Sequence, residues 1–151
     1  DAVAAIEAYV PANKRSQMTK TERNTLIVDA YNANPTSMAA ALENFSNVSA
    51  PVKIAMLGDM LELGEDSLAE HVAVIKSVAA RGLSKTFFVG KEFDAASEAV
   101  LQEGTLDLNT MQFFATSDQL AEHLAELQLN GATILIKGSR GTRMEKVIPA
   151  L

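Results

Sequence analysis

Three short segments hold most of the side chains that could bind or transfer a chemical group. One is KGSRG at 137–141, which combines Lys137, Ser139 and Arg140 with two glycines. Glycines let a backbone approach a ligand closely, amides at the start of a helix attract anions, and the two cations add to that attraction. We predict that this segment binds an anionic group. The alternative is an ordinary turn with solvated cations, because so short a motif is weak evidence alone.

A second segment, DAYNANP at 29–35, places Asp29, Tyr31, Asn32 and Asn34 within six residues. Carboxylate and amide groups suit ribose hydroxyls and phosphate or peptide groups. A functional role is favoured for the first three residues. For Asn34 the simpler interpretation is a helix N-cap, since a proline follows at the first helical position.

The third segment, GDMLELG at 58–64, brings Asp59 and Glu62 close together between two glycines. Two carboxylates at this spacing could act as an acid–base pair or hold a metal. A tight loop that uses its glycines for unusual dihedral angles explains the pattern better. His71 follows at the edge of the same region, and no cysteine or second histidine stands at metal-ligand spacing from it. The sequence therefore predicts no metal site.

Short apolar strands alternate with amphipathic helices, the pattern of an α/β Rossmann-like fold. We predict a three-layer αβα sandwich around a mostly parallel sheet of about six strands. Residues 1–24 form a lead-in helix and a linker or hairpin strand, and residues 25–151 form the domain. Capping-box spacing predicts helix starts at Ser67 and Thr116, and further helices are expected at 92–103 and 142–150. The expected core strands are Thr25–Ala30, Val52–Leu57, Lys85–Val89, Met111–Ala115 and Thr133–Lys137.

The polar segments that follow these strands should meet at one edge of the sheet. Crossovers between parallel strands are right-handed, so every carboxyl end lies on the same side, where ligands of such sheets bind. The segments are 29–35, 58–64, 89–93, 115–119 and 137–141. We therefore expect one composite site.

The composition excludes several other functions. With 13 basic and 19 acidic residues the net charge is −6, which disfavours nucleic acid, and the absence of cysteine excludes disulfides and thiolate chemistry. No apolar run is long enough for membrane insertion. The phosphate-loop, dinucleotide and nucleophile-elbow motifs are all missing. The chain has a ligand-binding edge without a complete catalytic apparatus.

Taken together, VDAYNANPTSM, LGDMLELG with His71, and KGSRGTRMEKV resemble the C-terminal domain of the Mur ligases, in particular the D-alanyl-D-alanine-adding branch. The likeness runs from about the NKRSQ stretch through the last helix. Branches that add other amino acids often carry an Asp-Asn-Pro-Arg signature where this chain reads ATSDQL.

The resemblance implies an ATP-dependent ligase of peptidoglycan precursor synthesis that joins D-Ala-D-Ala to UDP-MurNAc-tripeptide through an acyl phosphate. The N-terminal UDP-binding domain and the central ATPase domain, which would hold most of the Mg²⁺ contacts, are absent from this chain. The isolated domain should then be inactive, and the enzyme cytoplasmic. The alternatives are a lysine-, diaminopimelate- or folylpolyglutamate-type ligase domain, or a non-catalytic module that binds a nucleotide or peptide.

Residue roles can be carried over by position within the resemblance. Nucleotide binding falls on Asp29, Tyr31, Asn32 and Arg15. Substrate binding falls on Lys137, Ser139, Arg140 and Asn34. Asp59, Glu62 and His71 match motif positions to which the resemblance gives no role.

Overall fold

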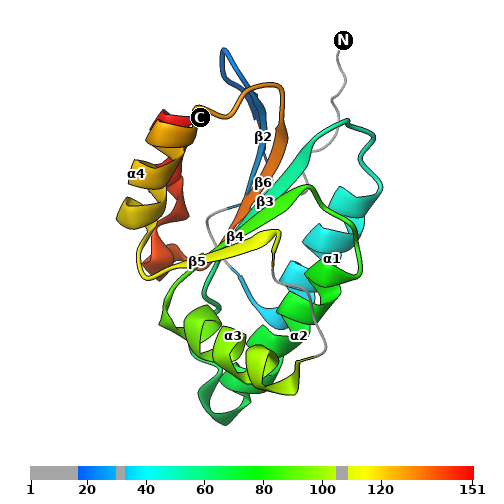
Figure 1. The fold of residues 1–151 in the computed structure, drawn as a ribbon, viewed down its shortest axis with the longest axis vertical. Helices are drawn as coiled ribbons and strands as arrows, with labels where there is room; N and C mark the ends of the chain where they lie inside the picture. The colour runs from blue at the N-terminus through cyan, green and yellow to red at the C-terminus, as the bar shows by residue number, and fades with distance from the viewer. Residues whose placement is uncertain (1–16, 30–32, 105–108) are drawn as a thin grey trace.

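A six-stranded, mostly parallel sheet forms the centre of the fold (Figure 1). The computed structural model describes residues 17–29, 33–104 and 109–151. The strand order is β1-β2-β6-β3-β4-β5, with β1 antiparallel to β2 and every other pair parallel. This confirms the predicted fold class. Of the two interpretations of the stretch before residue 25, a linker or a hairpin strand, β1 is the hairpin strand, and the expected lead-in helix lies outside the described residues. The strands are β1 (Gln17–Lys20), β2 (Thr25–Asp29), β3 (Lys53–Gly58), β4 (Lys85–Val89), β5 (Met111–Phe114) and β6 (Thr133–Lys137).

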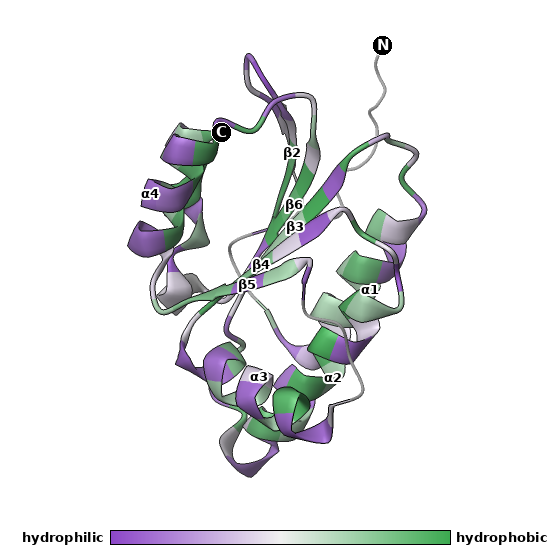
Figure 2. Ribbon diagram, viewed as in Figure 1, coloured by the Kyte–Doolittle hydropathy of each residue, from purple (hydrophilic) through white to green (hydrophobic). Residues whose placement is uncertain are grey.

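Helices cover both faces of this sheet and bury a separate apolar core on each. On one face lie α1 (Pro35–Ser46), α2 (Ser67–Ala79) and α3 (Lys91–Glu103). On the other lie α4 (Ser117–Leu127) and the 3-10 helix η3 (Met144–Ala150). Because the strands are covered on both sides, they are almost continuously apolar. Figure 2 shows this hydrophobic centre, and also the polar outer side of α4.

Two predicted helix starts are confirmed by local hydrogen bonds. The Asn34 side chain accepts from the Ser37 amide at 2.8 Å, and the Ser37 hydroxyl accepts from the Asn34 amide at 3.1 Å. The Thr116 side chain accepts from the Gln119 amide at 3.2 Å and caps α4. Such caps satisfy amides that have no partner within the helix.

Two other expectations about helix ends are wrong in part. Helix α2 begins at Ser67 as predicted, but Ser67 does not cap it, because its hydroxyl donates to Glu92 on α3. The expected helix at 142–150 is instead the 3-10 helix η2 (Arg140–Thr142) followed by η3. Arg143 between them adopts a left-handed conformation, and Pro149 cannot donate the hydrogen bond that an α-helix needs.

The predicted convergence of the strand ends is confirmed for the described residues. Asp29 ends β2 and pairs in register with Lys137 at the end of β6. Leu57 of β3 lies opposite Lys137 on its other side, so Asp59 and Ser139 follow from neighbouring strands. The hydroxyl of Ser139 donates to the carbonyl of Asp59 at 2.7 Å. The three motifs therefore share one edge of the sheet.

Candidate functional site

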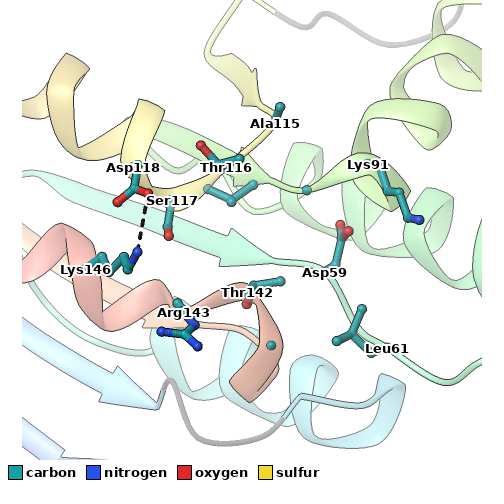
Figure 3. A pocket seen from close by; sticks show the side chains of 13 residues that line it. Asp59, Leu61, Lys91, Ala115, Thr116, Ser117, Asp118, Thr142, Arg143 and Lys146 are labelled. Carbon is teal, nitrogen blue, oxygen red and sulfur yellow. Dashed lines mark hydrogen bonds and ion pairs between the residues drawn. The ribbon is translucent and has the colours of Figure 1, made fainter.

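A pocket of about 370 Å³ opens at the carboxyl edge of the sheet (Figure 3). Its walls come from the segments that follow β3, β4, β5 and β6, which are four of the five segments predicted to converge. Of the fifth, residues 30–32 lie outside the described part of the chain. The lining residues are Asp59, Leu61, Val89, Gly90, Lys91, Ala115, Thr116, Ser117, Asp118, Gly141, Thr142, Arg143 and Lys146.

The pocket is more cationic than the acidic chain as a whole. Three basic side chains line it: Lys91 on the α3 side, and Arg143 and Lys146 on the η3 side (Figure 3). Lys146 contacts Asp118 at 3.3 Å in an exposed ion pair. Among the described residues, no carboxylate lies within ion-pair distance of Lys91 or Arg143. Helix α4 also begins at the pocket, and helix N-termini favour negative charge. The arrangement suits a small anionic ligand.

Arg143 is held in an unusual backbone conformation beside the pocket. Its φ is 54°, in the left-handed region that favours glycine. A residue with a side chain there carries a conformational cost, and such positions are concentrated at functional sites. Sequence reasoning missed Arg143, although it lies only three residues beyond Arg140 in the KGSRG motif. It also missed Lys91 and Lys146, for which a single sequence offers no distinguishing signal.

Asp59 is almost completely buried at the floor of the pocket, with 3% of its surface exposed. Its two carboxylate oxygens accept hydrogen bonds from the backbone amides of Glu92 and Phe93, each at 3.0 Å. Burial raises the pKa of Asp59 above its usual value, and the two amide hydrogen bonds oppose that shift only in part. Through the hydrogen bonds to the Glu92 and Phe93 amides, the Asp59 carboxylate caps α3, whose own N-cap residue Gly90 has no side chain.

His71 is fully buried behind this carboxylate. Its Nε2 accepts from the Met60 amide at 3.0 Å, and its Nδ1 lies 2.7 Å from the carbonyl of Ser67. These partners define a neutral tautomer with the proton on Nδ1. The ring also stands edge-on to Phe93, with 4.6 Å between centroids. The third motif position, Glu62, is exposed on the loop, and its φ is 65°.

Asp29 and Lys137, predicted to bind different ligands, form a buried ion pair. Nζ of Lys137 lies 2.7 Å from Oδ2 of Asp29, and the two side chains are 1% and 9% exposed. The structure thus brings together one residue from each predicted set. Asn34, predicted to bind substrate, is half-buried and caps α1. Arg15, Tyr31 and Asn32 lie outside the described residues, as does the side chain of Arg140.

Residues 17–29, 33–104 and 109–151 contain no group of three His, Cys, Asp or Glu side chains that could hold a metal ion. Within the same ranges, no helix is long and apolar enough to cross a membrane.

Comparison with known proteins agrees with the geometry. The family described as "Mur ligase, glutamate ligase domain" matches residues 14–140. The UDP-N-acetylmuramoyl-tripeptide–D-alanyl-D-alanine ligase of Escherichia coli is 37% identical over 134 residues, which are 86% of this chain and 27% of that protein. The ligase of the same name from Rickettsia prowazekii is 32% identical, over 89% of this chain and 29% of its own length. This chain therefore spans less than a third of these relatives.

Solved structures show the same arrangement of elements. A crystal structure of MurF from Acinetobacter baumannii superimposes with a TM-score of 0.77 at 30% identity, covering 95% of this chain and 31% of that one. MurF ligase from Thermotoga maritima in complex with ADP has a TM-score of 0.73 at 22% identity, over 97% of this chain and 31% of its own, and so supports the fold alone. The match over residues 14–140, together with these relatives, shows that the chain belongs to the Mur ligase family and carries its glutamate ligase domain.

Proposed function

We propose that this chain is the C-terminal part of an ATP-dependent ligase that joins D-Ala-D-Ala to UDP-MurNAc-tripeptide through an acyl phosphate. Two relatives that it matches are named UDP-N-acetylmuramoyl-tripeptide–D-alanyl-D-alanine ligase, and the chain spans under a third of their length. The rest of the enzyme would supply the UDP-binding domain and the ATPase domain. The chain would position the incoming dipeptide and close over the nucleotide, as mobile lid domains do in other enzymes.

The cationic pocket at the sheet edge is the observation that carries this proposal. Its volume of about 370 Å³ lies at the small end of ligand pockets, as suits a dipeptide. The dipeptide carboxylate would lie between Arg143 and the N-terminus of α4, where a guanidinium can bind it bidentately. The carbonyl of Ser139 accepts a hydrogen bond from the hydroxyl of Thr142, which lines the pocket. We propose that Ser139 and Lys137 support the dipeptide site together with Arg140 and Asn34.

The nucleotide would lie at the β2 side of the same edge. We propose that Asp29 meets the ribose, with Tyr31, Asn32 and Arg15 nearby. The Asp29–Lys137 ion pair supports this role, because it holds the carboxylate in one position at the end of β2. Mg²⁺ would be bound mainly by the central domain.

A substrate comparison in the full-length enzyme tests the proposal. Phosphate release from ATP is measured with UDP-MurNAc-tripeptide and either D-Ala-D-Ala, lysine, diaminopimelate or glutamate. We expect turnover only with D-Ala-D-Ala. Turnover with a single amino acid in its place would assign the chain to another branch of the family, and no turnover with any of them would favour a binding module. The isolated chain is expected to hydrolyse no ATP.

Direct binding to the chain locates the site. Titration with D-Ala-D-Ala is followed by amide NMR, and we expect shifts at residues 91, 117 and 141–143. Lys91→Ala should weaken the binding. Lys76→Ala is the matched control, because Lys76 is also an exposed helical lysine, paired with Glu103 away from the pocket. Equal effects of the two substitutions would remove the pocket from the proposal.

A further inference from the structure

We infer that Asp59 is the positioning residue of the pocket: it fixes two opposite walls through hydrogen bonds and does not itself contact the substrate. The inference rests on the proposed function, because it concerns the site assigned there to the dipeptide.

The Asp59 carboxylate fixes the wall that carries Lys91. Its hydrogen bonds to the Glu92 and Phe93 amides, each 3.0 Å long, cap α3 from 33 and 34 residues away. A Cβ on Gly90 would overlap this carboxylate, so a residue with a side chain at position 90 could not coexist with the cap. The start of α3, and with it the direction of Lys91, therefore depends on Asp59.

The Asp59 backbone fixes the opposite wall. Its carbonyl accepts from the hydroxyl of Ser139 at 2.7 Å and from the Ser139 amide at 3.3 Å. Its amide donates to the carbonyl of Val89 at 3.0 Å. One residue thus joins the loop after β3 to the end of β4 and to the loop after β6, which continues into Gly141–Arg143 along the pocket.

His71 lies next to Asp59 and bonds to the backbone of the following residue, Met60. Its Nε2 accepts the Met60 amide and lies 4.0 Å from Oδ1 of Asp59. His71 lies on α2, and the hydroxyl of Ser67 on the same helix donates to Glu92 at the start of α3. The loop after Asp59 and the first turns of α2 and α3 are therefore tied together, which leaves Asp59 little freedom to move.

The geometry argues against direct action of Asp59 on the substrate. Only 5% of its side chain is exposed, and both oxygens already accept backbone amides. A general base must reach the proton that it removes. The effect of Asp59 on catalysis should therefore be seen in the binding of the dipeptide and not in the chemical step.

Asp59→Asn in the full-length enzyme tests this inference, with Asp94→Asn as the matched control. In the variant, the side-chain NH₂ group of asparagine faces one of the two backbone N–H groups that donate to Asp59. One of the two capping hydrogen bonds is therefore lost. Asp94 lies in the same first turn of α3 but is exposed and has no capping hydrogen bond from its side chain. For Asp59→Asn we expect the KM for D-Ala-D-Ala to rise on the order of tenfold, since a hydrogen bond to a charged group is worth about that factor. The kcat and the KM for ATP should stay near wild type, and Asp94→Asn should change none of the three.

A second measurement on the 151-residue chain is independent of the reaction. As Asp59 titrates, the amide signals of Glu92, Phe93 and Ser139 should move with one common midpoint, and this should be absent in Asp59→Asn. Unlinked titrations, a fall in kcat alone, or an equal rise in the KM values of all substrates would overturn the inference. If the wild-type enzyme does not use D-Ala-D-Ala, the proposed function fails, while the common midpoint still decides whether Asp59 fixes both walls.

Discussion

Removing the charge of Lys137 should destabilise the fold severely. Nζ lies 2.7 Å from Oδ2 of Asp29, and the two side chains are only 1% and 9% exposed. At an effective dielectric constant of about 20, the Coulomb attraction at this distance is about 6 kcal/mol. Desolvation of both ions offsets much of that attraction in the intact pair. Removing one partner of a buried ion pair typically costs about 3–5 kcal/mol.

Urea unfolding of Lys137→Met, followed by circular dichroism, measures this loss. Methionine keeps most of the length of the side chain and removes only the charged end, so the core remains filled. We expect the free energy of unfolding to fall by about 3–5 kcal/mol, which corresponds to a drop in Tm of roughly 6–20 °C for a domain of this size.

A double-mutant cycle separates the ion pair from simple loss of packing. Asp29→Asn/Lys137→Met should be clearly less destabilised than the sum of the two single variants, because both substitutions remove the same interaction. Lys146→Met is the control, since its ion pair with Asp118 is exposed and should contribute less than about 1 kcal/mol. A loss below about 1 kcal/mol for Lys137→Met, or strict additivity in the cycle, would refute the reasoning.

Three further predictions concern stability and the pocket. Asn24→Ala should lower the free energy of unfolding by about 2–4 kcal/mol in urea, because its buried side chain makes three hydrogen bonds to backbone groups; a loss under about 1 kcal/mol would contradict this. Because the pKa of Asp59 is raised in the folded chain, the folded chain binds the proton of this carboxyl group more tightly than the unfolded chain does. The stabilisation that this proton provides is therefore present at low pH and is lost as the pH rises through the folded pKa. The stability of wild type relative to Asp59→Asn should therefore fall over that pH range, and a rise would show the opposite shift. Arg143→Gly should raise the free energy of unfolding by up to about 1 kcal/mol by relieving its positive φ, yet weaken D-Ala-D-Ala binding about tenfold; lower stability with unchanged binding would remove Arg143 from the site.

Much of the fold could be predicted because its signals are local. Nearly continuous apolar runs marked all five core strands, and the caps at Asn34 and Thr116 act within three residues along the chain. Parallel crossovers then placed the polar segments at one edge without further information. Where the local pattern failed, a distant partner had taken its place. Ser67 had the spacing of a capping residue, but its hydroxyl bonds to Glu92, which is 25 residues away.

The sequence by itself determined the family, the sheet and the edge at which its motifs meet. Only the tertiary structure decided what the motif residues do. It paired Asp29 with Lys137 across 108 residues, used Asp59 as the cap of α3, and collected Lys91, Arg143 and Lys146 around one pocket. The physical reason is that periodicity and capping depend on neighbours within about one turn of a helix, whereas burial, ion pairing and pocket shape depend on which strands become adjacent. In the sequence, an aspartate in a loop looks the same whether its carboxylate binds a ligand or caps a helix.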